Sequence, residues 1–276
     1  MSWAAVIVLH RSRAELARLL PTLDAPQLVV VDVGPDDGGM QLAREHGAHV
    51  LERRDNPGFG AANNLALEHV THPVAVLLNP DTIDQARVLP QLARRASRPG
   101  LHAPRLLNAD GSVQRSAHPL PGTLGAFLPA ALPWLPRAIR ERAEPYRAHT
   151  PRTVGWAIAA CLAAPTHLIR FDERLHLFAE DLDLCLQARA RGLRTFLHTD
   201  LALTHTGGHS IEAEPFEQLA RNRHDVIERR LGPRAARRDD AAQIVTFATR
   251  TWKGRRERQQ LGAALERRSP GQARAS

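Results

Sequence analysis

Short apolar runs alternate with amphipathic stretches along the first hundred residues. The runs Ala4–Leu9, Gln27–Val33, His49–Leu51 and Val74–Leu78 are rich in valine, leucine and alanine, and their lengths are typical of strands. Between them leucine and alanine recur at helical spacing, as in Ala61–His69. Strands that alternate with helices in this way predict βαβ units and a parallel sheet, and therefore an α/β fold.

The alternation continues in the second half of the chain. Val154–Ala164 is small and apolar throughout, which predicts a buried segment. Glu180–Arg191 has helical spacing and is followed by Gly192, a residue that commonly ends helices. Thr195–His198 and Leu201–His205 then predict two short strands.

The composition is that of an ordinary globular protein, with 43% hydrophobic and 24% charged residues in a chain of 276. No apolar run reaches the roughly 18–20 residues of a membrane span. The N-terminus lacks a basic leader and a cleavage site, so it predicts a first strand rather than a signal peptide. Cys161 and Cys185 lie in apolar surroundings without a CxxC neighbour, which predicts core positions and a reducing, cytoplasmic setting.

Basic residues are concentrated near the end of the chain, which carries a net charge of +8 overall. The cluster consists of Arg221, Arg223, Arg229, Arg230, Arg234, Arg237, Arg238, Lys253, Arg255, Arg256, Arg258, Arg267 and Arg268. Three interpretations are open: a nucleic-acid surface, a surface for an anionic membrane, or a solvated tail. No recognised nucleic-acid motif accompanies the arginines, so we expect no nucleic-acid partner.

Three carboxylates, Glu180, Asp181 and Asp183, fall within four residues at the start of a predicted helix. Acidic residues there commonly cap the helix, because its first backbone N–H groups have no partner within it. The same position can present a carboxylate to a cleft, where it can act as a general base. Asp32 and Asp81 each follow a predicted strand, and the carboxyl ends of parallel strands meet at the sheet edge where ligands bind.

Five segments, taken in order, resemble one known family. They are VVDVGPDDG at residues 30–38, NPGFGAANN at 56–64, LLNPD at 77–81, FDE running into EDLDL within 171–184, and HTGGHS at 205–210. Together they are similar to the family 2 glycosyltransferases of the GT-A fold, particularly the rhamnosyltransferase-like branch. The resemblance implies a Rossmann-like α/β fold with a central, mostly parallel mixed sheet flanked by helices.

The resemblance also implies roles in the reaction. Asp81 matches the carboxylate that holds a divalent cation, Mg²⁺ or Mn²⁺, against the donor's diphosphate, and His205 matches a histidine that completes the metal site. Asp181 matches the base that deprotonates the acceptor hydroxyl. Glu180 and Asp183 are expected to orient Asp181 or to cap the helix, with Asp183 on the acceptor side.

Further matches concern the nucleotide and the acceptor. Asp32 matches a carboxylate that accepts a hydrogen bond from the pyrimidine base. Asn56, Gly58 and Asn64 match the loop around the nucleotide, where glycine allows close backbone approach. Trp156 matches the segment beside the acceptor pocket, where its ring could stack on a sugar; burial in the core is the alternative.

The implied domain organisation is one GT-A catalytic domain over residues 1–215, followed by a basic helical appendage. Nucleotide-sugar binding is expected in residues 1–110, and the acceptor side and the base in residues 111–215. The appendage spans residues 216–276 and is expected to be partly disordered at its end.

The implied activity is inverting transfer of a sugar onto a cell-envelope glycan or a polyprenyl-linked sugar. L-Rhamnose from dTDP-L-rhamnose is the expected donor group. One alternative is a UDP-sugar-dependent transferase that uses galactofuranose, glucose or GlcNAc. Another is a non-catalytic relative that binds nucleotide-sugar or an envelope partner, because the residues after Asp32 depart from the family's pattern and Ile169-Arg170 stands where the family has a glycine pair. The basic second half suits a cytoplasmic protein in peripheral contact with the inner face of the plasma membrane.

Overall fold

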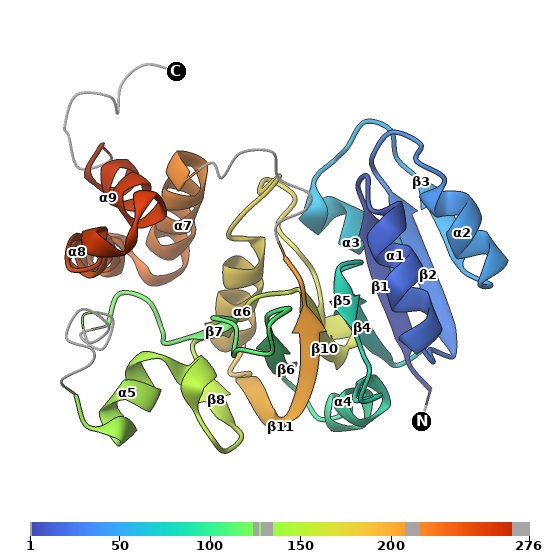
Figure 1. The fold of residues 1–276 in the computed structure, drawn as a ribbon, viewed down its shortest axis with the longest axis horizontal. Helices are drawn as coiled ribbons and strands as arrows, with labels where there is room; N and C mark the ends of the chain where they lie inside the picture. Colours follow the sequence, from blue (N-terminus) through green and yellow to red (C-terminus); the bar gives the residue numbers. More distant parts are fainter. Residues whose placement is uncertain (1, 124–126, 128–134, 208–215, 267–276) are drawn as a thin grey trace.

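The computed structural model describes residues 2–123, 127, 135–207 and 216–266. Within these residues one large sheet forms the centre of the protein, and a two-stranded sheet lies beside it (Figure 1). The strands of the large sheet are, in spatial order, β3 (His49–Glu52), β2 (Gln27–Asp32), β1 (Ala4–Leu9), β4 (Val74–Leu78), β10 (Cys161–Pro165), β6 (Leu101–Leu107), β11 (Thr195–His205) and β5 (Thr82–Ile83). Strand β8 (Arg152–Val154) also pairs with β11, and the small sheet joins β7 (Ala117–His118) to β9 (Trp156–Ala157).

The first half of the large sheet is parallel, as the alternation of strands and helices predicts. β1 pairs with β2 and with β4, and β2 pairs with β3, all in parallel. β10 then lies antiparallel between β4 and β6, so the sheet as a whole is mixed. This arrangement confirms the predicted α/β fold class. The two strands expected near residue 200 form one strand, β11, whose register against β6 shifts between His198 and Ala202.

Helices cover both faces of the large sheet and create a core on each face. Along β1, Val6 belongs to the core with α3 and α6, whereas Ala5 and Ile7 belong to the core with α1 and α4, because successive side chains of a strand point to opposite faces. The helices are α1 (Arg13–Leu19), α2 (Gly39–Glu45), α3 (Phe59–Glu68), α4 (Leu89–Arg95), α5 (Arg137–Ala143), α6 (Glu180–Ala190), α7 (Phe216–Leu231), α8 (Pro233–Ala248) and α9 (Arg255–Glu266).

Helices α7, α8 and α9 lie together at one end of the molecule, and α7 packs against α6 (Figure 1). Val226 and Ile227 of α7 are fully buried in the same core as α3 and α6. The domain boundary expected at residue 215 stays a prediction, and α7, which follows it, contributes apolar side chains to the core that contains α3 and α6. The disorder expected at the end of the chain falls on residues outside the described ones.

Two further expectations concern burial and membranes. Cys161 and Cys185 are buried and unpaired, as the apolar context of each predicts. None of the helices in the described part of the chain combines the length and the apolarity that a bilayer crossing requires.

Candidate active site

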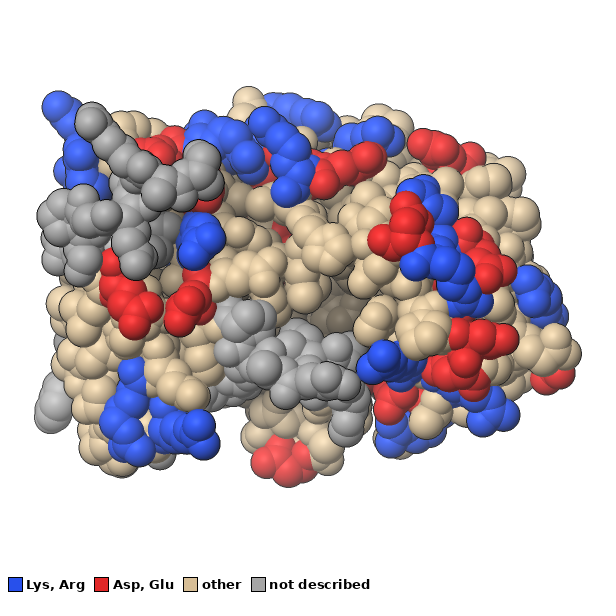
Figure 2. Space-filling model, turned by 90° about the horizontal axis from the view of Figure 1, so that it is seen from above, with Lys and Arg blue, Asp and Glu red and all other residues tan. Residues whose placement is uncertain are grey.

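The carboxyl ends of the parallel strands meet at one edge of the large sheet. Leu9 is paired with Asp32, and Asp32 with Glu52, so β1, β2 and β3 end together. Asp81 follows the end of β4 at the same edge. Figure 2 looks down on this side of the molecule and shows a hollow near its middle, with charged residues gathered to either side. A hollow at the carboxyl edge is where an α/β sheet usually binds its ligand.

Asp32 ends β2 with a buried carboxylate. Its Oδ1 accepts a hydrogen bond from the backbone N–H of Gly34 at 3.0 Å, and its Oδ2 lies 3.5 Å from Nη1 of Arg54. Burial raises the pKa of Asp32 above its usual value, while the Gly34 N–H and the Arg54 charge oppose that rise. A carboxylate in this position can accept a hydrogen bond from a ring N–H of a pyrimidine. The Arg54 guanidinium competes with the pyrimidine for this carboxylate.

Asn56 and Gly58 shape the turn between β3 and α3. Both have positive φ, 42° for Asn56 and 92° for Gly58, and the Asn56 carboxamide oxygen accepts a hydrogen bond from the Gly58 N–H at 3.4 Å. A Cβ on Gly58 would overlap the carbonyl oxygen of His176. Only glycine fits here, because the turn passes directly against residues 171–179, which we call the α6 loop.

Asn64 connects helix α3 to the α6 loop. Its Nδ2 donates to the carbonyl oxygen of Phe171 at 3.0 Å and to the carboxylate of Glu173 at 2.8 Å, and its Oδ1 accepts from the Phe171 N–H at 2.9 Å. Both ends of the carboxamide are thus engaged within the chain. The structure makes Asn64 an anchor of the loop, and its contact with a nucleotide stays a prediction.

Asp81 and His205 lie against each other although they come from different strands. Oδ1 of Asp81 is 3.3 Å from Nε2 of His205, and Nδ1 of His205 is 2.8 Å from Oε1 of Gln114. Nε2 of Gln114 donates to Oδ1 of Asn108 and to the carbonyl of His205, so Oε1 is its accepting end. Nδ1 of His205 therefore carries a proton, and Nε2 is the ring nitrogen that faces Asp81.

This pair has the donor set and the spacing of two neighbouring ligands of a divalent cation. Ligands at right angles around an octahedral ion with bonds of about 2.1 Å lie about 3.0 Å apart. Burial acts to raise the pKa of Asp81, but His205 and the backbone N–H of Gly207 hold that pKa below its usual value, so the carboxylate stays charged. Among the described residues no cluster of three or more His, Cys, Asp or Glu side chains could hold a metal. A cation here would take its other ligands from substrate and water.

Glu180 and Asp181 open helix α6 after a turn of uncommon backbone geometry. Phe178 and Ala179 both adopt the left-handed conformation, with φ of 71° and 68°, which costs a non-glycine residue about 1–2 kcal/mol. Asp181 is half-buried and accepts a hydrogen bond from the Leu182 N–H at 2.7 Å, whereas Glu180 is buried. The turn fixes the direction in which α6 starts, and with it the position of Asp181.

The two carboxylates differ in their protonation near neutral pH. Burial, and then the charge of Asp181, raises the pKa of Glu180 to about 8. Burial also raises the pKa of Asp181 to about 6, while the N–H groups of Leu182 and Ala159 and the charge of Arg223 limit the rise. Asp181 is therefore the member of the pair that is ionised at pH 7 and able to accept a proton.

One short segment between β9 and β10 binds both Asp181 and the backbone just before Asp81. The N–H of Asn79, two residues before Asp81, donates to the carbonyl of Ala160 at 2.9 Å. The N–H of Ala159 makes a hydrogen bond to the Asp181 carboxylate. Because the two alanines are adjacent, Asp81 and Asp181 lie at the same edge of the sheet.

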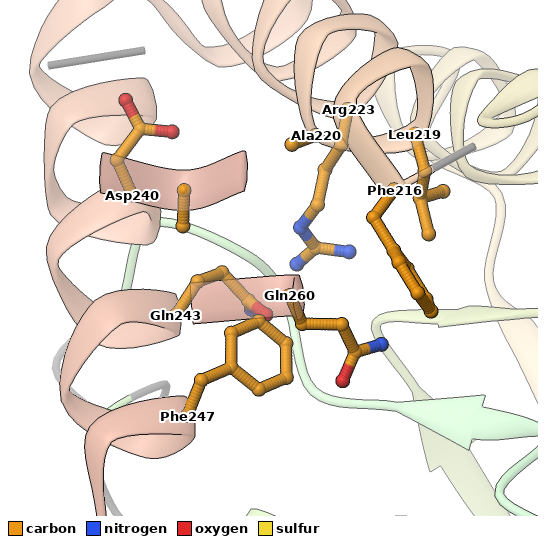
Figure 3. A pocket seen from close by; sticks show the side chains of 9 residues that line it. Phe216, Leu219, Ala220, Arg223, Asp240, Gln243, Phe247 and Gln260 are labelled. Atoms are coloured by element: carbon orange, nitrogen blue, oxygen red, sulfur yellow. The ribbon is translucent and has the colours of Figure 1, made fainter. Parts of the chain in front are cut away.

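Trp156 lies among groups from three elements. The ring is 9% exposed, stacks on His118 with ring centroids 4.1 Å apart, and lies 5.6 Å from the guanidinium of Arg223. Arg223 pairs with Asp239 through two hydrogen bonds, of 2.7 and 3.0 Å. Its guanidinium points into a cavity of about 60 Å³ between α7, α8 and α9 (Figure 3). Within the described part of the chain, Nε1 of the buried Trp156 has no hydrogen-bond partner.

Asp183 is fully buried between α6 and α7. Its carboxylate accepts hydrogen bonds from Arg229 at 3.1 Å, from Arg230 at 2.8 and 2.9 Å, and from Gln187 at 2.7 Å. The acceptor-side role expected for this residue has no support in this geometry, because both oxygens are engaged by α7 and by α6 itself.

Sequence reasoning missed several residues that the structure brings to the site. Gln114 sets the proton position of His205, and Arg223, Arg229 and Arg230 contact the site from α7. The arginines were visible only as part of a basic run, and nothing in their local pattern indicates partners 40 or more residues away in sequence.

Solved structures, among them a mannosyltransferase, share this fold. The mannosyltransferase PcManGT from Pyrobaculum calidifontis, in complex with GDP-Man and Mn²⁺, superposes with a TM-score of 0.60 at 15% identity, over 97% of this chain and 81% of its own. GalNAc-T7 with UDP, GalNAc and Mn²⁺ superposes with a TM-score of 0.58 at 14% identity, over 83% of this chain, which spans about half (48%) of that protein. The fold is that of the GT-A glycosyltransferases.

Sequence comparison gives the same class of protein. Residues 6–124 match the model of the glycosyl transferase family 2. The N-acetylglucosaminyl-diphospho-decaprenol L-rhamnosyltransferase of Mycobacterium tuberculosis, in strains CDC 1551 and H37Rv, is 28% identical over 242 residues, which is 76% of this chain and 76% of the relative. The chain is a glycosyltransferase, and its residues 6–124 are similar to the glycosyl transferase family 2.

Proposed function

We propose that this protein transfers L-rhamnose, with inversion, from dTDP-L-rhamnose to a lipid-linked sugar. The observation that carries the proposal is that Asn79, two residues before Asp81, and Asp181 bind the adjacent residues Ala160 and Ala159 at one edge of the sheet. This arrangement puts a place for the donor's diphosphate beside a carboxylate that is ionised at neutral pH.

The reaction needs one bond made and one broken at the anomeric carbon. The acceptor hydroxyl oxygen attacks that carbon from the face opposite the diphosphate, the bond to the diphosphate oxygen breaks, and the hydroxyl proton passes to Asp181. A divalent cation held by Asp81 and His205 would neutralise the charge that builds on the departing dTDP. Glu180, protonated at neutral pH, adds no second negative charge beside Asp181. Calorimetric titration with each ion distinguishes Mg²⁺ from Mn²⁺.

The donor assignment is supported by the relative from Mycobacterium tuberculosis, whose name is that of an L-rhamnosyltransferase. The buried Asp32 carboxylate suits the ring N–H that thymine and uracil share. A UDP-sugar donor is therefore the second candidate, since this contact does not distinguish the two bases.

The acceptor assignment is supported by the same relative, whose printed name includes a diphospho-decaprenol group. On this chain the cavity between α7, α8 and α9 has apolar walls that include Phe216, Leu219 and Phe247, and Arg223 links it to Trp156 (Figure 3). An acceptor with a sugar beside Trp156 and an apolar chain along these helices matches that arrangement.

A cytoplasmic protein that meets a lipid-linked acceptor must contact the inner face of the membrane. Arg234, Arg238 and Val245 lie on one exposed face of α8 by their spacing, and Trp252, 78% exposed, follows the helix. Arginines with exposed apolar residues suit an anionic bilayer surface. Co-sedimentation with phosphatidylglycerol vesicles but not with phosphatidylcholine vesicles, reduced in Trp252→Ser, is the expected result; equal recovery without lipid would contradict it.

The first experiment is calorimetric titration with dTDP and with UDP, each with Mn²⁺, with Mg²⁺ and with neither. Metal-dependent binding that favours dTDP supports the rhamnosyltransferase proposal. Preference for UDP replaces the donor and leaves the transferase. If the folded protein binds neither nucleotide, the proposal fails and the non-catalytic alternative takes its place.

A further inference from the structure

Helix α7 holds the turn from which α6 starts. Asn222 of α7 donates from Nδ2 to the carbonyl oxygen of Leu177 at 2.8 Å and to that of Phe178 at 3.3 Å. Ala179, which follows them, is the residue that caps α6, and Glu180 is the first residue of the helix. A single amide group therefore fastens the backbone immediately before the carboxylate pair.

This turn is strained where it is fastened. Phe178 and Ala179 are two of the few non-glycine residues with positive φ in the described part of the chain, and they are consecutive. A Cβ makes this conformation unfavourable, and such strain persists only where the surroundings impose it. Without the Asn222 amide the turn can relax toward negative φ, which would change the start of α6 and move Asp181.

The anchor itself is rigid. Val226 and Ile227, one turn beyond Asn222, are fully buried in the core, and Arg230 pairs with the buried Asp183. The α6 loop is also fastened at its start, by Asn64 at Phe171, and beside Leu177, by the Phe59 N–H at His176. The contacts of Asn222 thus join this rigid helix to the two residues that precede the α6 cap, Ala179.

We propose that Asn222 is a positioning residue of the transfer reaction, holding the left-handed turn that places Asp181 against the acceptor hydroxyl. The inference rests on the proposed role of Asp181 as the base. A misplacement of about 1 Å at a reacting group can cost about 100-fold in rate. We expect nucleotide binding at Asp32 and Asp81 to change less than kcat, because Asn222 holds Leu177 and Phe178 and not these carboxylates.

The test is a double-mutant cycle of Asn222→Ala and Ala179→Gly, with Gln218→Ala as the matched control on the exposed side of α7. Asn222→Ala is expected to lower kcat by about 10- to 100-fold with less than about a twofold change in the KM for the donor. Glycine adopts positive φ without the Cβ penalty, so in the Ala179→Gly background the same Asn222→Ala change should cost less than about threefold. Gln218→Ala is expected to keep wild-type kinetics.

Each outcome bears on the inference. If Asn222→Ala lowers kcat equally with Ala or Gly at residue 179, or acts only on the donor KM, the inference is wrong. If Asn222→Ala does not fold, the Ala179→Gly variant is measured by itself. The inference then requires that this variant keeps the wild-type kcat and has a higher Tm than the wild type. A lower Tm overturns the inference. Asp181→Asn is measured in the same series to separate the two proposals. If Asp181→Asn is active, Asp181 is not the base. If Asp181→Asn is inactive and Asn222→Ala is fully active, only the positioning role of Asn222 is refuted.

Discussion

Replacing Asp183 by Asn tests how much of the structure's stability depends on the contact between α6 and α7. The carboxylate is fully buried and accepts four hydrogen bonds, three of them from Arg229 and Arg230. Asn has the same shape as Asp, but an NH₂ group replaces one of the two carboxylate oxygens. In either orientation of the amide, this NH₂ group faces N–H donors and cannot accept their hydrogen bonds. Two hydrogen bonds are lost whichever way the amide turns, together with the charge.

The expected loss follows from those contacts. A hydrogen bond to a charged group contributes about 1.5–3 kcal/mol, so two of them set a scale of about 3–6 kcal/mol. The arginines are 31% and 27% exposed, and Arg229 keeps Asp172 at 3.2 Å, so water and this second carboxylate offset part of the loss. We expect the free energy of unfolding to fall by about 3 kcal/mol and Tm by about 6 °C.

The assay is urea unfolding followed by far-UV circular dichroism, with Asp200→Asn as the matched control. Asp200 also forms a two-pronged pair with one arginine, Arg95, but its side chain is 47% exposed. Its replacement is expected to cost less than about 1 kcal/mol. Equal losses in the two variants would refute the reasoning, because burial is the difference on which the prediction depends.

Other expected results concern the nucleotide turn, the metal pair and the carboxylate pair. Gly58→Ala should lower the free energy of unfolding by about 3 kcal/mol or more, because the new Cβ overlaps His176. Gly47 also has positive φ but open space around it, so Gly47→Ala should cost about 1 kcal/mol. Similar Tm values for the two variants would contradict this prediction. Asp81→Ala should remove the Mn²⁺-dependent part of dTDP binding in calorimetry, and binding that still responds to Mn²⁺ would reject the metal assignment. The pH profile of kcat/KM should fall below about pH 6 as Asp181 becomes protonated, and an acid limb near pH 4 would argue against a buried base. Glu180→Gln should raise Tm more at pH 9 than at pH 5, because a raised folded-state pKa means that stability is lost as pH rises from 4.5 through about 8.

Several features of the site could be predicted without coordinates because they are local. The strand Val74–Leu78 has the predicted bounds, and Asp81 follows it at the edge of the sheet where parallel strands end. The start of α6 at Glu180 also agrees, since acidic residues favour the first turn of a helix. The proximity of Asp81 and His205 was expected only from the family resemblance, because no local pattern relates residues 124 positions apart.

The sequence alone determined the alternating α/β architecture, the core strands and the carboxylates at their ends. These features depend on the order of apolar and polar residues within short segments. Only the tertiary structure decided what helix α7 does. Its arginine-rich sequence is typical of a solvated tail. The same sequence is equally compatible with arginines that face water and with arginines that pair with buried carboxylates. Asn222, Arg223 and Arg230 become part of the site because packing of Val226 and Ile227 brings α7 against α6, and that depends on which faces meet across long separations in the chain.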